Sequence, residues 1–396
     1  MIVHIEVAAK PVRPASAVGR PQRTLQRPLR DRFGPLRSPT RWMISPVVAV
    51  TLCLGVSCGS SEPPPGDSIG VCGPADQPAP VHCIGRFDEN SRFIWPGSAI
   101  VARMTGTQVS IRFDETQGGN YFEVVIDGEV RPVLHTRAGD RTYALGENLA
   151  AGAHDVSVTR RTESRFGITR FLGFAGATLV STNGHERLIE IVGDSITCGY
   201  GVLGASPSCR FSADTEAETY AWGALAGAAV GADVVAIAQS GKGLLRNRPG
   251  DTSDPMPKRF ERIFPDDETS QWTFVTTPDV VVIALGTNDF VDGDPGQPFV
   301  AAYEDFLTQI RGHYPQAWIL LAGSPMLLAD AHAKHAAYVE QTAAAMAARG
   351  DKRVATVEIA EQSSDDGLGC DYHPGRATQR KMADALLAAI RTHVGW

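Results

Sequence analysis

Four short polar segments of the sequence hold residue types that acyl transfer requires, and three of them directly follow an apolar run. In chain order they are Gly193-Asp194-Ser195, Gln239-Ser240-Gly241-Lys242-Gly243, Gly286-Thr287-Asn288-Asp289 and the segment GCDYHPG, which contains Asp371 and His373. A serine hydroxyl is a weak nucleophile until an imidazole takes its proton during attack. A histidine suits that task because its ordinary pKa is near neutral. Ser195 and His373 are therefore candidates for nucleophile and base.

The tetrahedral intermediate of acyl transfer carries an oxyanion, which fixed hydrogen-bond donors stabilise. The backbone N–H groups of Ser195 and Gly241 and the side-chain amide of Asn288 can supply three such donors. Each residue also has a plain structural explanation: a small residue in a turn, a glycine with positive φ, a cap, or, for His373 before Pro374, the start of a helix. Their occurrence in order at strand ends favours chemistry.

An alternation of strand-like and helix-like runs positions these segments. The predicted strands are Leu188–Val192, Asp233–Ala238, Val280–Leu285, Trp318–Ala322 and Val354–Ile359, and the predicted helices are Glu218–Val230, Phe299–His313, Ala331–Arg349 and Thr378–His393. Nearly continuous apolar strands separated by helices predict a parallel sheet covered on both faces. Ligands bind at the carboxyl ends of such strands, so we expect the polar segments to meet there.

The sequence before this α/β region has a different texture. From about residue 86 to residue 180, apolar residues alternate with a period of two and are separated by turn signals such as Asp-Gly and Ala-Gly. This pattern predicts an all-β domain over residues 85–182, of the sandwich or jelly-roll type. A polar connector, STNGHER, then leads to a catalytic domain over residues 188–396.

The motifs GDSIT, SGKG, GTND and the late His-Pro resemble the four sequence blocks of the SGNH (GDSL-type) hydrolases. GDSITCGYG as a whole, SGKGLLRN and DYHP more specifically resemble family 2 carbohydrate esterases, which remove acetyl groups from plant polysaccharides. The β region fits as well, through FIWPGS, IDG and AGAHDVSVTRRTE. The resemblance covers roughly residues 85–396.

This resemblance implies a jelly-roll domain joined to a flavodoxin-like, three-layer α/β/α catalytic domain. Carried over by position, Ser195 is the nucleophile, His373 the base, and Gly241 and Asn288 are oxyanion donors. The implied protein is a monomeric, cofactor-free and metal-free serine esterase whose partner is an acetylated polysaccharide such as xylan or glucomannan. The alternatives are a lipase or thioesterase, a peptidoglycan O-acetyl esterase, and a carbohydrate-binding lipoprotein without catalysis.

The third member of the expected triad departs from the family pattern. Most SGNH enzymes place an aspartate three residues before the histidine, but Cys370 occupies that position here and Asp371 lies two residues before His373. We expect the Asp371 carboxylate to orient His373. The alternative is a Ser-His dyad whose imidazole is oriented by a backbone carbonyl.

The N-terminal residues read as a leader followed by a tether. Residues 1–42 hold nine basic and two acidic residues and precede an apolar run, Ile44–Val56, that is too short to span a bilayer. We expect a leader or signal region over residues 1–58 and a Pro/Ser/Gly-rich tether over residues 59–84. Met43 is an alternative start. Cys58 resembles the lipid-modified cysteine of bacterial lipoproteins, so secretion and lipid anchoring both stay open.

Charge and cysteine usage limit the partners. The chain carries a net charge of −7 and its first 42 residues carry +7, so the remainder carries −14, which argues against nucleic acid. In an oxidising compartment, local pairing predicts disulfides Cys198–Cys209 and Cys72–Cys83, with Cys370 left over. There is no CxxC pair to support zinc. His332 and His335 share a helix spacing without a third ligand, and we expect them on a solvated face.

Overall fold

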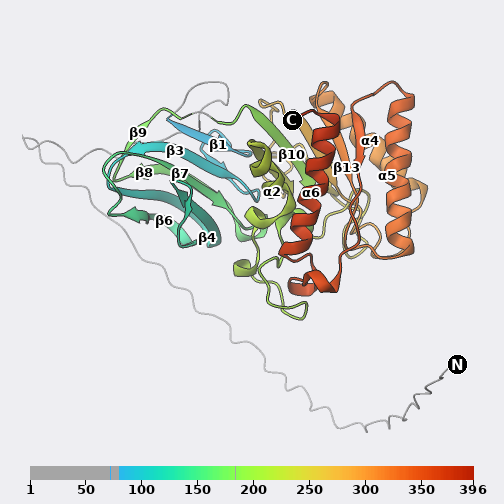
Figure 1. Ribbon diagram of the computed structural model, residues 1–396, viewed down its shortest axis with the longest axis horizontal. Helices are drawn as coiled ribbons and strands as arrows, with labels where there is room; N and C mark the ends of the chain where they lie inside the picture. The colour runs from blue at the N-terminus through green and yellow to red at the C-terminus, as the bar shows by residue number, and fades with distance from the viewer. Residues whose placement is uncertain (1–71, 73–79, 183) are drawn as a thin grey trace, which may run out of the picture. The chain divides into compact units, whose positions relative to one another are not determined.

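A computed structural model describes residues 72, 80–182 and 184–396 of the chain (Figure 1). Most of the predicted tether lies outside these residues, as do the predicted leader, the apolar run and Cys58. Within the described part of the chain, we find no helix with both the length and the apolar character needed to cross a membrane.

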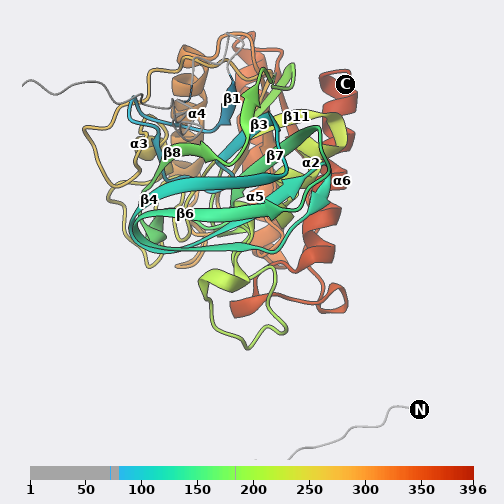
Figure 2. The same cartoon turned by 90° about the vertical axis from the view of Figure 1, so that its left-hand side faces the viewer.

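The first described domain is built from antiparallel strands that share one apolar core. Their hydrogen-bonded order is β1-β3-β7-β4-β8-β2, with β5 and β6 paired to β4 and β9 paired to β3; the long strands β4 and β6 run side by side (Figure 2). The strands are β1 Val81–Ile84, β2 Arg92–Phe93, β3 Ala99–Thr105, β4 Gln108–Ile126, β5 Glu129–Val130, β6 Leu134–Glu147, β7 Ala153–Arg160, β8 Thr169–Ala175 and β9 Thr178–Val180. The alternation seen in the sequence buries every second side chain of β7.

The lower boundary of this domain lies earlier than the sequence predicts. Residues 81–84, assigned above to the tether, form β1 and pair in antiparallel register with β3. Val81 is fully buried in the core of the β domain. The boundary at residue 85 was therefore wrong, because a four-residue strand next to prolines is too short to show its alternation.

The second domain contains a five-stranded parallel sheet in the order β11-β10-β12-β13-β14. Its strands are β10 Arg187–Gly193, β11 Ala232–Ala238, β12 Val280–Ala284, β13 Trp318–Ala322 and β14 Val354–Val357. Helices α2 (Trp222–Val230) and α6 (Arg376–His393) lie side by side and share one apolar core with the sheet (Figure 1). Helices α4 (Gln297–His313) and α5 (Asp330–Ala348) pack in a second core formed by the opposite set of strand residues.

The strand order explains where three of the four polar segments meet. Strand β10 lies between β11 and β12, and all three run parallel. The segments that follow these strands therefore leave the sheet at the same edge, next to one another. This is the switch point at which open parallel sheets bind their ligands.

The two domains share buried contacts. Arg86 of the β domain is fully buried and donates to the carbonyl oxygens of Phe260 and Arg262 and, at 3.3 Å, to the carboxylate of Glu190. Trp95, also fully buried, packs in the core formed by the sheet, α4 and α5. Buried hydrogen bonds and apolar packing thus connect the β domain to the catalytic domain.

One of the two predicted disulfides is present and the other is wrong. Cys72 is bonded to Cys83, at a sequence separation of 11 residues. Cys209 is bonded to Cys370, 161 residues away, whereas Cys198 is a free, buried thiol. The predicted Cys198–Cys209 pair fails because Cys198 is the last residue of the short helix α1 (Ser195–Cys198), and its side chain is directed into the interior.

Removing the Cys209–Cys370 disulfide should destabilise the protein more than removing Cys72–Cys83, because it closes a far longer loop. The loop-entropy relation gives about 5 kcal/mol for the first bond and about 3 kcal/mol for the second. Urea unfolding of the two paired Cys→Ala variants measures this difference. Cys198→Ser is the matched control, since it removes a thiol without removing a bond. Equal midpoints for wild type and Cys209→Ala/Cys370→Ala would contradict the pairing.

Candidate active site

Ser195 is the second residue after β10 and opens helix α1. Two glycines make this sharp turn sterically feasible. A Cβ on Gly193 would lie 2.1 Å from the hydroxyl oxygen of Thr197. Gly199 ends the helix with φ of +69°, and a Cβ there would lie 2.2 Å from the carbonyl oxygen of Ala217. The serine is thereby held at the carboxyl end of β10.

His373 lies directly opposite this serine. Its Nε2 atom is 2.9 Å from Oγ of Ser195, and its Nδ1 atom is 3.2 Å from the backbone carbonyl oxygen of Asp371. An Nδ1–H that donates to this carbonyl leaves Nε2 free to accept the serine proton. Burial lowers the pKa of His373 to about 4, so the imidazole is neutral at pH 7.

The Asp371 carboxylate is directed elsewhere, and our expectation that it orients His373 is not met. It accepts hydrogen bonds from the Tyr200 hydroxyl and the Phe211 backbone N–H, both at 3.0 Å, and from Arg210 at 3.3 Å. Asp371 and Tyr372 both adopt left-handed backbone conformations, with φ of +50° and +63°. This turn presents the carbonyl of Asp371, and not its side chain, to the imidazole.

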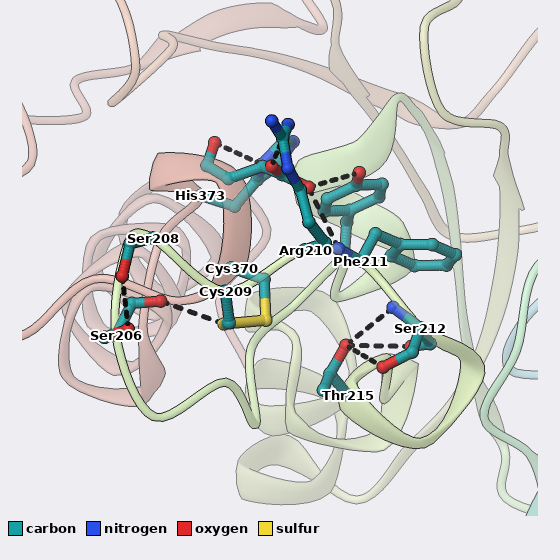
Figure 3. The surroundings of a disulfide bond; sticks show 11 residues. Ser206, Ser208, Cys209, Arg210, Phe211, Ser212, Thr215, Cys370 and His373 are labelled. Carbon is teal, nitrogen blue, oxygen red and sulfur yellow. Dashed lines mark hydrogen bonds and ion pairs between the residues drawn. A yellow bond between two sulfur atoms is a disulfide. The ribbon is translucent and has the colours of Figure 1, made fainter.

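Tyr200 and the disulfide support the loop that carries His373. The rings of Tyr200 and His373 stack with their centroids 4.1 Å apart. The Cys209–Cys370 bond joins the loop after Ser195 to the residue three positions before the histidine (Figure 3). A Cβ on Gly204 would lie 2.4 Å from the Cys370 sulfur, so the two loops touch closely.

The three expected oxyanion donors lie around the same cavity, which Ser195, Gly241 and Asn288 all line. Gly241 has φ of +79°, which explains the glycine although a Cβ would meet nothing closer than the Arg248 carbonyl oxygen, at 3.9 Å. The Asn288 amide donates to the carbonyl oxygen of Lys242 at 2.8 Å, and its nitrogen is 3.3 Å from the Asp194 carboxylate. The first contact is a full hydrogen bond and fixes the direction of the amide.

Two aspartates of the motifs support these donors. Asp194 caps helix α1 by accepting from the backbone N–H of Ile196 at 2.9 Å. Asp289 accepts three backbone N–H groups of the loop after β11, at 2.7 to 2.9 Å, from Leu244, Leu245 and Arg246. The GTND segment therefore anchors the loop that contains Gly241.

The cavity has a volume of about 660 Å³ and is open to solvent, and both apolar and charged side chains form its wall. Its wall includes the apolar residues Phe290, Val291, Met326 and Leu327, and three arginines, namely Arg165, Arg210 and Arg248. Tyr372 also lines the cavity with 62% of its surface exposed. Trp222 is fully buried, and its ring nitrogen is 3.3 Å from the Thr197 hydroxyl.

One cluster of metal-ligand residue types occurs among the described residues. Atoms of Glu163, Cys198 and Glu216 lie within 4.8 Å of one another. Burial raises the pKa of the Cys198 thiol, and burial together with the Glu163 carboxylate raises that of Glu216. Both shifts favour the protonated forms of these two groups, and a protonated thiol or carboxyl group is a poor ligand for a cation.

The expectation of a solvated face is met by neither α5 histidine. His332 is half-buried, and its Nε2 atom is 2.8 Å from the carbonyl oxygen of Ile359. His335 is almost fully buried, and its Nε2 atom is 2.9 Å from the carbonyl oxygen of Leu285. Burial lowers its pKa to about 4. The residue therefore packs α5 against the end of β12, directly before the GTND segment.

Comparison with known proteins agrees with the family that the sequence motifs predict. The Carbohydrate esterase 2 N-terminal family matches residues 83–182, and the GDSL-like Lipase/Acylhydrolase family matches residues 191–381. The solved structure of a family two carbohydrate esterase from Clostridium thermocellum, in complex with cellohexaose, is 33% identical with a TM-score of 0.77. The match covers 80% of this chain and 99% of that one. The chain belongs to carbohydrate esterase family 2. Both the family resemblance and the SGNH fold behind a β-rich domain are thereby confirmed.

Two further relatives are also esterases by name. Cellulase/esterase CelE of Acetivibrio thermocellus is 34% identical over 321 residues, which are 79% of this chain and 39% of that protein. An acetylxylan esterase / glucomannan deacetylase of Cellvibrio japonicus is 26% identical over 319 residues, which are 78% of this chain and 86% of that protein. Family 2 is thus a family of carboxylic ester hydrolases.

Three supporting residues escaped the sequence analysis. Tyr200 stacks on His373, Asp289 anchors the Gly241 loop, and Glu163 contacts the same loop from the β domain. Asp289 could have been found, since it ends the GTND motif. Glu163 carries no local signal, because its partner lies 77 residues away in another domain.

Asp371→Asn should retain turnover to within about 10-fold, because the carbonyl that contacts His373 is unchanged and asparagine accepts a left-handed backbone. The same change in the aspartate of a Ser-His-Asp triad costs roughly 10⁴-fold. Initial rates on 4-nitrophenyl acetate give the answer. Asp371→Ala is the companion variant and should be less stable, since alanine disfavours φ of +50°. A loss near 10⁴-fold for Asp371→Asn would restore the carboxylate as the orienting group.

The rate should stay constant to a lower pH than an ordinary histidine allows. The base acts as neutral imidazole, and burial lowers the pKa of His373 to about 4. The value of kcat/KM should therefore be flat from pH 7 to about pH 5 and fall tenfold per pH unit below about 4. Circular dichroism at each pH separates this loss from unfolding. An acid limb centred near 6.5 would show that the imidazole is not desolvated.

Proposed function

We propose that this protein is a serine esterase that removes O-acetyl groups from a polysaccharide, with acetylated xylan and glucomannan as the leading substrates. The observation that carries the proposal is the 2.9 Å contact between Oγ of Ser195 and Nε2 of His373 at the wall of an open cavity. A nucleophile within hydrogen-bond reach of an oriented base is the arrangement that acyl transfer needs. Family 2 membership and the names of the relatives support the substrate class.

The mechanism follows from the positions of the groups. Nε2 of His373 takes the serine proton as Oγ of Ser195 attacks the acetyl carbonyl carbon. The oxyanion that forms is stabilised by the N–H groups of Ser195 and Gly241 and by the Asn288 amide. Collapse breaks the ester bond, and the imidazolium returns its proton to the departing sugar oxygen. Water then attacks the acetyl-enzyme with the same base, which releases acetate and restores the serine.

The orientation of the base is part of this proposal. Because the Nδ1 atom of His373 lies 3.2 Å from the carbonyl oxygen of Asp371, we infer a Ser-His dyad with a backbone orienter. The carbonyl fixes the tautomer and the ring direction, which is the main task of the aspartate in a triad. The Asp371 carboxylate then serves the loop, through Tyr200 and Phe211.

Secretion is proposed on the same footing. Two disulfides, Cys72–Cys83 and Cys209–Cys370, are typical of an oxidising compartment. The sequence of the leader is compatible with release or with a lipid anchor at Cys58. A monomer that acts on an extracellular polysaccharide is the simplest arrangement.

Ser195→Ala should lower acetate release by at least about 10³-fold while leaving the unfolding temperature unchanged, because the hydroxyl is the attacking group. Acetate release is measured on acetylated xylan, glucomannan and peptidoglycan side by side, and 4-nitrophenyl esters of two to twelve carbons report the acyl preference. Because three arginines line the cavity, the xylan is tested with and without uronic acid side groups.

We expect the wild-type protein to prefer acetyl esters over longer acyl chains and plant polysaccharides over peptidoglycan. A maximum on long acyl chains would identify a lipase or thioesterase instead, and activity confined to peptidoglycan would identify a cell-wall esterase. Binding of polysaccharide with equal turnover by wild type and Ser195→Ala would leave a carbohydrate-binding protein.

A further inference from the structure

We propose that Glu163, a residue of the β domain, is a positioning residue for the oxyanion site of the catalytic domain. The inference rests on the proposed function, since it assigns Glu163 a task in the reaction of Ser195. The resemblance by motif places all oxyanion donors in the catalytic domain. The structure adds a carboxylate from outside that domain.

The contact joins the two domains at the loop that carries Gly241. Oε2 of Glu163 accepts the backbone N–H of Ser240 at 2.8 Å. Glu163 is 1% exposed and Ser240 is half-buried, so this hydrogen bond is partly shielded from water. Ser240 directly precedes Gly241, and its carbonyl carbon belongs to the peptide that bears the Gly241 N–H. Holding the backbone N–H of Ser240 in place therefore restricts the direction of the Gly241 N–H.

Glu163 is itself held rigidly by its own backbone. Its N–H donates to the Glu216 carboxyl group at 2.9 Å, and its carbonyl oxygen accepts from Arg160 at 3.1 Å. Arg160 is fully buried and also donates to the carbonyl oxygens of Thr162 and Gly167 and to the Thr169 hydroxyl. The turn that presents the carboxylate is thus bonded on several sides.

The charges around Glu163 favour its ionised form and hold its carboxylate in place. A guanidinium nitrogen of Arg165 lies 2.8 Å from Oε1 of Glu163. Burial and the Glu163 carboxylate raise the pKa of Glu216, which favours its uncharged form. Arg165 also lines the cavity, which places this segment of the β domain at the active site.

A preorganised donor lowers the barrier only if it is directed at the developing charge before reaction. After Gly241, its carbonyl accepts from the Arg248 N–H, and Asp289 accepts from residues 244 to 246. Before Gly241, the Gln239 N–H donates to the Gly193 carbonyl at 3.3 Å, and Glu163 accepts the N–H of Ser240 itself. Without it, the Ser240 N–H loses its buried acceptor, and the loop must move to satisfy it.

Glu163→Ala should lower kcat on 4-nitrophenyl acetate by about 10²-fold, the loss typical of one oxyanion donor, with KM changed less than about 3-fold. The inhibition constant of phenylboronic acid should rise in parallel, because its tetrahedral serine adduct uses the oxyanion site. Glu163→Gln should stay within about 10-fold of wild type in both measurements, since its amide oxygen accepts the same N–H.

Glu123→Ala is the matched control. Glu123 is another carboxylate of the β domain that accepts from the catalytic domain, at 3.2 Å from the Thr219 hydroxyl. Its removal should leave kcat and the boronate inhibition constant unchanged. Should Glu163→Ala not fold, Glu163→Asp keeps the charge beside Arg165 but withdraws the acceptor, and the same losses are expected.

Wild-type kcat and boronate affinity in folded Glu163→Ala or Glu163→Asp would overturn the proposal. Equal losses in Glu163→Gln and Glu163→Ala would also overturn it, by showing that the charge and not the acceptor matters. Either result leaves the proposed function intact as long as Ser195→Ala is inactive. Absence of esterase activity in the wild-type protein would instead refute the proposed function.

Discussion

The hydrogen bond between Ser195 and His373 is the interaction on which the arrangement of the catalytic domain depends. The two residues are 178 positions apart in the chain, and their side-chain atoms must meet within 2.9 Å. The serine is fixed by the geometry of β10 and by two glycines with no room for a side chain. The histidine lies on an irregular loop, so its position has to be imposed by other contacts.

Those contacts explain several features that look unrelated in sequence. The disulfide from Cys209 to Cys370, the stacking of Tyr200 and the left-handed turn at Asp371 all act on the loop before His373. The Asp371 carboxylate bonds to groups that follow Ser195, namely Tyr200 and Phe211. The loop after the nucleophile thus holds the loop before the base, and the backbone carbonyl of Asp371 is free to meet the imidazole.

The parts of the fold that repeat locally were predictable, and the long-range contacts were not. Strands such as Trp318–Ala322 and helices such as α6 follow from apolar periodicity, and the carboxyl-end rule then places Ser195, Gly241 and Asn288 together. The Cys209–Cys370 bond could not be predicted, because spacing favours a near partner over one 161 residues away. The prediction that the Asp371 carboxylate orients His373 failed for a related reason, because the sequence does not show in which direction a turn points a side chain. The prediction of a solvated His335 was wrong because the sequence of α5 does not show which face of the helix packs on the sheet.

The charges around the site are arranged so that little negative charge opposes an oxyanion. Asp194 precedes the nucleophile, but burial raises its pKa to about 7, which reduces its charge at neutral pH. Burial raises the pKa of Glu216 as well, and Glu163 is paired with Arg165. Three arginines face the cavity, although the chain beyond residue 42 carries −14. Charges act strongly across the low-dielectric protein around a cleft. An acidic protein can therefore stabilise an anionic intermediate, because burial raises the pKa of Asp194 and Glu216 and because arginines of the cavity wall pair with Glu163 and Asp371.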